Sequence, residues 1–140
     1  MTTNTRLESD AQTHEEAVES VRDAIGAYCH ALDDGRVDDL VALFTADGVS
    51  ALPGMEPVEG HDALRQLYRG LTPQAPQRHL VVNTVVTEQG DRATALSDLV
   101  FLARGESGWA VSLVGRYEDV LRRENGRWRF ARRSLSFAGA

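Results

Sequence analysis

His79 has the clearest capacity for chemistry in this 140-residue chain, because it opens the strand-like run RHLVVNTVV at residues 78–86. The β-branched residues that follow are typical of a buried strand, so the run carries an imidazole toward an apolar interior. A histidine in such a position usually bonds to backbone or water. Asn83 shares the odd-numbered face with His79, and two hydrogen-bonding groups on one face favour a strand that lines a pocket.

Asp33 and Tyr28 lie on a segment with helical periodicity and could act together with His79. Asp33 belongs to the string DDG, which is common turn chemistry, but acidic residues are disfavoured at the negative end of a helix dipole. A nearby imidazole would explain this carboxylate, and an aspartate that fixes a histidine tautomer is an arrangement used in general-base catalysis. Tyr28 lies in the apolar stripe, where its hydroxyl needs a partner, so structural and catalytic roles both stay open.

Asp98 interrupts the apolar run LSDLVFL, where a buried charge would be costly without a partner. In one interpretation it lines the pocket, and Asn83, Asp98 and Arg116 contact the substrate. In the other, Asp98 forms an ion pair with Arg116 in the neighbouring run VGRYEDV. The ion pair is the simpler interpretation.

The elements that must position these residues fall into two groups. Residues 1–12 are polar and aperiodic, and we expect them to be disordered, so residues 13–140 form the single domain. Helical patterns follow at residues 15–32, 37–44 and 61–71, with a short strand at residues 49–52. Gly35 is placed to take the left-handed conformation after the first helix. Four strand-like runs complete the chain, at residues 78–88, 92–104, 108–123 and 127–137.

Helices at the front and long consecutive strands at the back predict an α+β domain. We expect a curved antiparallel or mixed sheet that wraps around three N-terminal helices as a cone. Asn125-Gly126 provides the strongest hairpin signal between two of the strands. The open mouth of such a cone would be a pocket for a small apolar molecule.

Composition excludes several kinds of chemistry. All 15 basic residues are arginine, so no lysine is present to form a Schiff base or to hold pyridoxal phosphate. The single cysteine, Cys29, allows no disulfide and no thiolate zinc site. Histidine spacings typical of metal sites and glycine-rich phosphate loops are absent from the sequence. We therefore expect no metal and no cofactor.

Charge and hydropathy limit the partners. The net charge of −6 argues against nucleic acid, because phosphate binding needs a basic face. The basic cluster RRENGRWRFARR is more simply interpreted as the solvated face of an edge strand. The chain has no apolar run of transmembrane length and no signal-peptide core at its start, so we expect a cytoplasmic protein without membrane contact.

Four strings carry a family resemblance: YCHALDDGRVDDLVALFTADGV, EGHDAL, RHLVVNTVV and GRYEDVLRRENGRWRFARRSL. Together they resemble the SnoaL-like members of the nuclear-transport-factor-two-like superfamily over almost everything from residue 15 onward. The resemblance implies the cone fold but leaves the reaction open, because the superfamily includes dehydratases, ketosteroid isomerases, polyketide cyclases, epoxide hydrolases and proteins without catalysis.

The pattern of Tyr28, Asp33 and His79 is most similar to the scytalone dehydratase and bile acid dehydratase branch. This similarity implies an Asp33–His79 dyad at the pocket floor and a tyrosine, Tyr28, that orients the substrate oxygen. The next strand lacks the further histidine of scytalone dehydratase. Asp98 is the nearest polar residue there and is similar to the second acid of the bile acid enzyme.

Three functional hypotheses follow. The first is a cofactor-independent lyase or isomerase in which His79, oriented by Asp33, removes a proton next to a carbonyl of a polycyclic, steroid-like or polyketide-like substrate. The second keeps the pocket but makes Asp33 the base of a polyketide-type cyclisation or double-bond shift. The third is a non-catalytic binding module, which a pocket filled by large side chains would favour. In each case we expect a homodimer through the outer sheet face.

Overall fold

The computed structural model describes the backbone of residues 2–139 and the side chains of residues 14–139. Three helices and six strands make up this part of the chain. The helices are α1 (Thr2–Asp33), α2 (Val37–Val41) and α3 (His61–Arg69). The strands are β1 (Phe44–Ala51), β2 (Val58–Glu59), β3 (Gln77–Gln89), β4 (Arg92–Gly105), β5 (Gly108–Glu124) and β6 (Arg127–Phe137).

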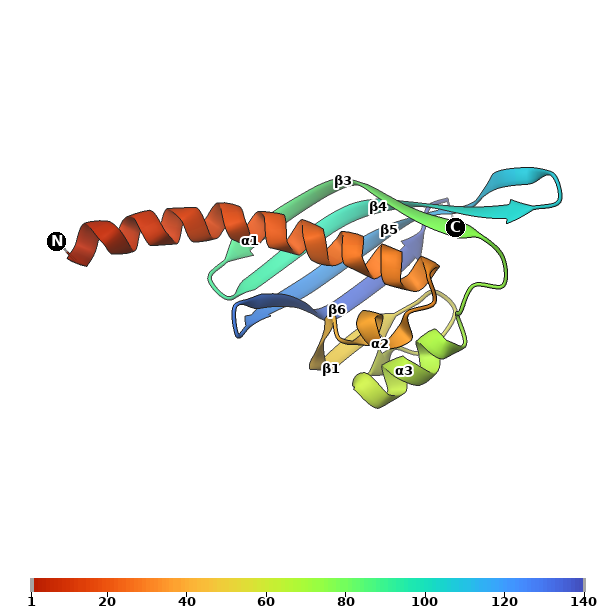
Figure 1. Cartoon of the computed structure of the whole chain (residues 1–140), viewed down its shortest axis with the longest axis horizontal. Coiled ribbons are helices and arrows are strands. Elements are labelled where there is room, and N and C mark those ends of the chain that lie inside the picture. Colours follow the sequence, from red (N-terminus) through yellow and green to blue (C-terminus); the bar gives the residue numbers. More distant parts are fainter. Residues whose placement is uncertain (1, 140) are drawn as a thin grey trace.

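All six strands form one sheet in the order β2-β1-β6-β5-β4-β3. The pairing of β1 with β6 is parallel and the other pairings are antiparallel, as expected for a mixed sheet. Figure 1 shows α1 lying across one face of this curved sheet, with α2 and α3 gathered near β1. The predicted α+β class and the helix-on-sheet architecture are confirmed.

Two element boundaries differ from the prediction. α2 ends at Val41, and Phe44 already belongs to β1, where it pairs with Phe130 and is fully buried. Phe44, which was predicted at the end of the helix, is therefore a buried residue of the sheet. In addition, α1 continues back to Thr2, whereas residues 2–12 were expected to be disordered. No glycine or proline before Gly26 interrupts the helix, and its first turns extend beyond the sheet (Figure 1).

The interior between α1 and the sheet is filled by large side chains. Tyr28 makes edge contacts with the rings of Phe44, Tyr68, Tyr117 and Phe130, all of which are buried. These contacts favour tight packing, since aromatic pairs stabilise beyond their buried area. No helix in residues 2–139 is both long and apolar enough to cross a membrane.

Gly115 on β5 allows close packing against β6. A Cβ at this position would lie 2.8 Å from the Ser136 carbonyl oxygen and 3.0 Å from Leu135 Cδ1. Gly115→Ala should therefore lower the free energy of unfolding by about 1–3 kcal/mol, because a backbone atom cannot easily move away. Gly105→Ala is the matched control, since nothing lies within 4 Å of its Cβ. Thermal unfolding of both variants checks this, and equal melting temperatures would contradict it.

Candidate functional site

His79 and Asp33 form a close pair between β3 and the end of α1. His79 Nδ1 lies 2.6 Å from Asp33 Oδ1, and the backbone N–H of His79 donates to Asp33 Oδ2 at 2.8 Å. Gln77 Nε2 donates to Asp33 Oδ1 at 3.1 Å. Three donors thus fix the orientation of one carboxylate. The neutral imidazole tautomer that fits this arrangement carries its proton on Nδ1 and leaves Nε2 unprotonated.

Local structure brings the two residues together. Asp33 is the last residue of α1, and Gly35 follows at φ 69°, the left-handed conformation that was predicted. Arg36 N–H donates to the carbonyl of Ala31 and closes the helix end. On β3, His79 pairs with Phe101 of β4, whose ring lies 4.6 Å from the imidazole. The side chains of His79 and Asp33 are 12% and 6% exposed, so the pair is largely shielded from solvent.

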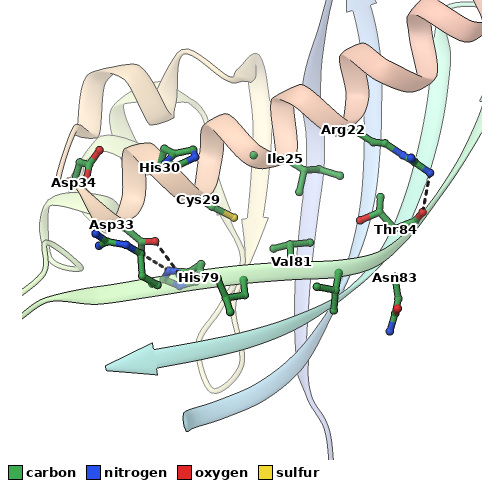
Figure 2. Close-up of a pocket in the computed structure, with 14 residues that line it drawn as sticks. Arg22, Ile25, Cys29, His30, Asp33, Asp34, His79, Val81, Asn83 and Thr84 are labelled. Atoms are coloured by element: carbon green, nitrogen blue, oxygen red, sulfur yellow. Dashed lines mark hydrogen bonds and ion pairs between the residues drawn. The ribbon is translucent and has the colours of Figure 1, made fainter. Parts of the chain in front are cut away.

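The pair lines a cavity of about 750 Å³ between α1 and β3. Ile25, Gly26 and Cys29 contribute the α1 wall, and Val81 faces them from β3 (Figure 2). The cavity is therefore apolar between its two polar ends, with the dyad at one end and Arg22 and Thr84 at the other. Large side chains fill the core between α1 and the middle of the sheet. The dyad therefore does not face a central cavity but lines this groove along the β3 edge.

Asn83 borders the cavity at the strand edge, but its side chain does not share the face of His79, so the predicted alternation is corrected. It adopts φ 56°, and the β3–β4 register shifts between Val82 and Val85. This bulge inverts the alternation, so Thr84 instead of Asn83 turns toward α1. Figure 2 shows the Asn83 side chain pointing away from the helix.

Asp98 and Arg116 also lie on the outer face of the sheet, and neither of them lines this cavity. Arg116 Nε donates to Asp98 Oδ1 at 2.9 Å, and Asn83 Nδ2 donates to Asp98 Oδ2 at 3.0 Å. These bonds lower the pKa of the Asp98 carboxyl, with Asn83 the larger cause. The three residues form an outer polar network, and the simpler interpretation as an ion pair agrees with the structure.

Tyr28 belongs to the core and does not meet the dyad. Its side chain is 1% exposed, and its hydroxyl lies 2.8 Å from the Tyr68 hydroxyl, which in turn lies 2.9 Å from Ser50 Oγ. Burial raises the pKa of Tyr28 well above its ordinary value. Tyr28 does not line the cavity, and its hydroxyl has a partner inside the protein, so the structure favours the structural alternative for this residue.

A second charged pair, Asp119 and Arg133, was not predicted. Both side chains are almost fully buried, with Arg133 Nε 3.1 Å from Asp119 Oδ1, and neither makes a hydrogen bond within the described residues. The guanidinium lies over the rings of Tyr117 and Tyr28, at 3.6 and 4.2 Å from their centroids. Burial raises the pKa of Asp119 to about 6, although Arg133 opposes this rise. Asp119 in turn raises the pKa of Arg133 above its ordinary value, against the effect of burial.

The side chains of residues 14–139 include no group of three or more histidine, cysteine or acidic residues arranged to hold a metal. Cys29 borders the cavity, but burial raises the pKa of its thiol to about 11. A thiol in this state is a poor nucleophile at neutral pH. The reactive groups that the structure places together at the cavity are thus an imidazole and a carboxylate.

Solved structures share this fold. A nuclear-transport-factor-two-like protein with a cystatin-like fold from Novosphingobium aromaticivorans is 26% identical, with a TM-score of 0.86 over 97% of this chain and 90% of that one. A protein from the same organism, provisionally named a scytalone dehydratase, is 21% identical, with a TM-score of 0.81 and coverage of 91% and 88%. A protein of unknown function from Mycobacterium tuberculosis is 24% identical, with a TM-score of 0.85 and coverage of 91% and 75%.

No curated protein matches the sequence at a significant level. A family comparison, in contrast, matches residues 13–134 to the SnoaL-like domain, a range that includes most of α1, most of the sheet and both members of the dyad. The match covers far more than half of the chain and agrees with the resemblance seen in its sequence strings. The chain belongs to the SnoaL-like domain family.

Proposed function

We propose that this protein is a cofactor-independent enzyme of the dehydratase or isomerase type that acts on a polycyclic, steroid-like or polyketide-like ketone. One observation carries the proposal: His79 Nδ1 lies 2.6 Å from Asp33 Oδ1 at the wall of a largely apolar cavity. Asp33 holds the imidazole in the tautomer that presents Nε2 as a base. An apolar surrounding strengthens the electrostatic interactions of such a pair.

The proposed first step is removal of a proton from the carbon next to the substrate carbonyl. The proton goes to His79 Nε2, and the electron pair of the broken C–H bond forms the enolate. In an isomerisation, the imidazolium returns the proton to another carbon. In a dehydration, it protonates a hydroxyl group on the β carbon, which leaves as water while the carbon–carbon double bond forms. Both routes regenerate the neutral imidazole.

Deuterium exchange tests this step without knowledge of the natural substrate. The protein is incubated in deuterium oxide with β-tetralone and with an androstane ketone whose carbonyl is on ring A. Mass spectrometry then follows deuterium at the carbons beside the carbonyl. We expect exchange faster than in buffer alone, because enolate formation alone is sufficient for exchange. Exchange at the buffer rate with both ketones would count against the proposal.

Cyclisation remains a second chemical possibility, with Asp33 as the base and His79 in support. The bonds from Gln77 and from the backbone of His79 occupy this carboxylate, which favours an orienting role over direct proton removal. A comparison of the exchange rates of the His79→Gln and Asp33→Asn variants separates the two assignments.

A non-catalytic binding module is favoured by a different observation, namely the filled interior under α1. The fully buried side chains there include Tyr28, Tyr68, Tyr117 and Arg133, which leave the groove at the β3 edge as the ligand site. Binding of the ring-A ketone without any exchange above the buffer rate would support this alternative.

We further propose that the protein forms a homodimer through the outer face of β3, β4 and β5. Leu80, Val82, Leu96 and Val114 are 41–46% exposed there, around the Asp98–Arg116 pair. Apolar side chains grouped around a polar centre are typical of an interface. Val82→Glu should therefore convert a dimer to a monomer in native mass spectrometry. Leu71→Glu is the control, because Leu71 is 42% exposed but follows α3; a wild-type monomer would contradict the proposal.

A further inference from the structure

Two arginines line the cavity that contains the dyad: Arg78 lies at the dyad end and Arg22 at the opposite end. Figure 2 shows Arg22 and Thr84 at one end, His79 and Asp33 at the other, and Ile25, Cys29 and Val81 between them. Five residues of β3 separate His79 from Thr84, which corresponds to about 16 Å of extended strand. Eleven residues of α1 separate Arg22 from Asp33, which also corresponds to about 16 Å. The groove thus suits a long, narrow molecule.

The bulge in β3 shapes the end of the cavity that is remote from the dyad. Asn83 adopts φ 56°, and the register shift beside it turns Thr84 toward α1. Arg22 Nη2 donates to the Thr84 carbonyl oxygen at 3.2 Å, which holds the guanidinium at the cavity. Among the side chains of residues 14–139, no carboxylate forms an ion pair with Arg22. Its other N–H donors are available to a planar anion in the groove.

The charges at the two ends favour one orientation of a ligand. Asp33 and Asp34 line the dyad end, together with Arg78, whose guanidinium donates to the Gln77 carbonyl oxygen. Asp34 Oδ2 lies 3.6 Å from Nη2 of Arg36, a residue that does not line the cavity. Asp33 is paired with His79. The dyad end thus holds two carboxylates and one guanidinium, whereas Arg22 is the charged side chain of the lining at the other end. The net charge of the two ends therefore favours an anionic group beside Arg22.

We propose that Arg22 is a specificity residue that binds the carboxylate of an elongated apolar substrate whose ketone end lies at His79. This inference rests on the proposed function for the identity of the ketone end, but recognition of the carboxylate is a binding property that can be measured separately. It narrows the substrate class to polycyclic ketones with a carboxylate at the end remote from the reacting carbon.

The test uses two probes that differ only in charge: an androstane ketone with its carbonyl on ring A and a carboxylic acid on ring D, and the methyl ester of the same compound. Calorimetry measures the affinity of the full-length protein for each probe. We expect the acid to bind about three- to tenfold more tightly than the ester at low salt, the range for a partly exposed, charge-assisted pair. The preference should weaken as salt is added.

Arg22→Gln should bind acid and ester equally, whereas Arg22→Lys should retain part of the preference because it keeps the charge but not the planar donors. A merely structural role at the bulge would lower the melting temperature and weaken both probes alike, leaving their ratio unchanged. Equal wild-type affinity for acid and ester, or no binding of either, would overturn the inference.

The catalytic proposal and the role of Arg22 can be contradicted independently of each other. If the acid is preferred through Arg22 but no deuterium exchange occurs, the carboxylate site stands and the catalytic proposal falls. If exchange occurs but the acid has no advantage over the ester, the catalytic proposal stands and the role of Arg22 falls.

Discussion

His79→Gln should lower the rate of deuterium exchange beside the ketone by about 10²–10⁴-fold, the usual contribution of a positioned general base. Glutamine keeps hydrogen-bonding capacity and similar length, so the Asp33 carboxylate retains a possible partner. It has no nitrogen that accepts a proton near neutral pH, and the exchange step therefore loses its base. Mass spectrometry of β-tetralone or the ring-A ketone in deuterium oxide measures the change.

His30→Gln is the matched control for this substitution. His30 also lines the cavity, from the last turn of α1, but its side chain is exposed and makes no hydrogen bond to another side chain within the described residues. Its replacement should leave the exchange rate within about twofold of wild type, as expected for a surface change without a reaction partner. Equal losses in the two variants would mean that neither histidine is the base.

Asp33→Asn separates the base from the residue that orients it. An asparagine amide can donate toward Nδ1, which favours the tautomer with the proton on Nε2 and thus removes the reactive lone pair. If Asp33 only orients His79, this variant should lose no more of the exchange rate than His79→Gln does. A larger loss in Asp33→Asn than in His79→Gln would assign the base to Asp33 and favour the cyclisation alternative.

The dyad was predictable because its signals are local. An aspartate at a helix end and a histidine at the start of a buried strand are visible in the residue pattern, and the family resemblance placed them together across 46 residues of sequence. The structure brings both atoms within hydrogen-bond reach. In contrast, Tyr28 precedes Asp33 on the same helix, and helical periodicity placed its ring correctly in the core. The pattern could not reveal that its hydroxyl bonds to Tyr68, 40 residues away.

The errors elsewhere come from strand irregularities. Strict alternation places Asn83 on the face of His79, but one residue in the left-handed conformation inverts the strand beyond it. The prediction that the basic cluster RRENGRWRFARR is a solvated face is wrong for β6 for a similar reason. Trp128 and Phe130 point inward, the register then shifts, and Arg133 also points inward although its number has the opposite parity. In addition, β6 lies between β1 and β5, so it is a central strand and not the expected edge.

Arg133→Met should lower the free energy of unfolding by about 3–5 kcal/mol at pH 7, because it leaves the buried Asp119 carboxylate without its cation. Methionine occupies a similar volume, so the loss reflects charge more than a cavity. It also removes the guanidinium from the rings of Tyr117, Tyr28 and Phe130. Urea unfolding measures the change, and a loss below about 1 kcal/mol would show that the pair contributes no more than a surface ion pair.

Asp119→Asn should have a smaller effect than Arg133→Met, and adding it to Arg133→Met should recover much of the lost stability. Burial raises the pKa of Asp119 to about 6, so the folded protein already favours the neutral form of this side chain more than the unfolded chain does. The amide imitates that neutral form, while Arg133 keeps its contacts with the aromatic rings. If Asp119→Asn alone lowered the free energy of unfolding as much as Arg133→Met, the prediction would be contradicted. The attraction between the two charges would then exceed the cost of burying the Asp119 carboxylate.

The same pKa shift sets the pH dependence. The ordinary aspartate pKa is about 3.9, so between about pH 4 and pH 6 the folded chain holds the Asp119 proton more tightly than the unfolded chain does. The contribution of Asp119 to the free energy of unfolding therefore falls as pH rises through this window. Asp119→Asn should remove that part of the slope. In Arg133→Met the opposing cation is gone, so the pKa should rise further and the decline should extend to higher pH.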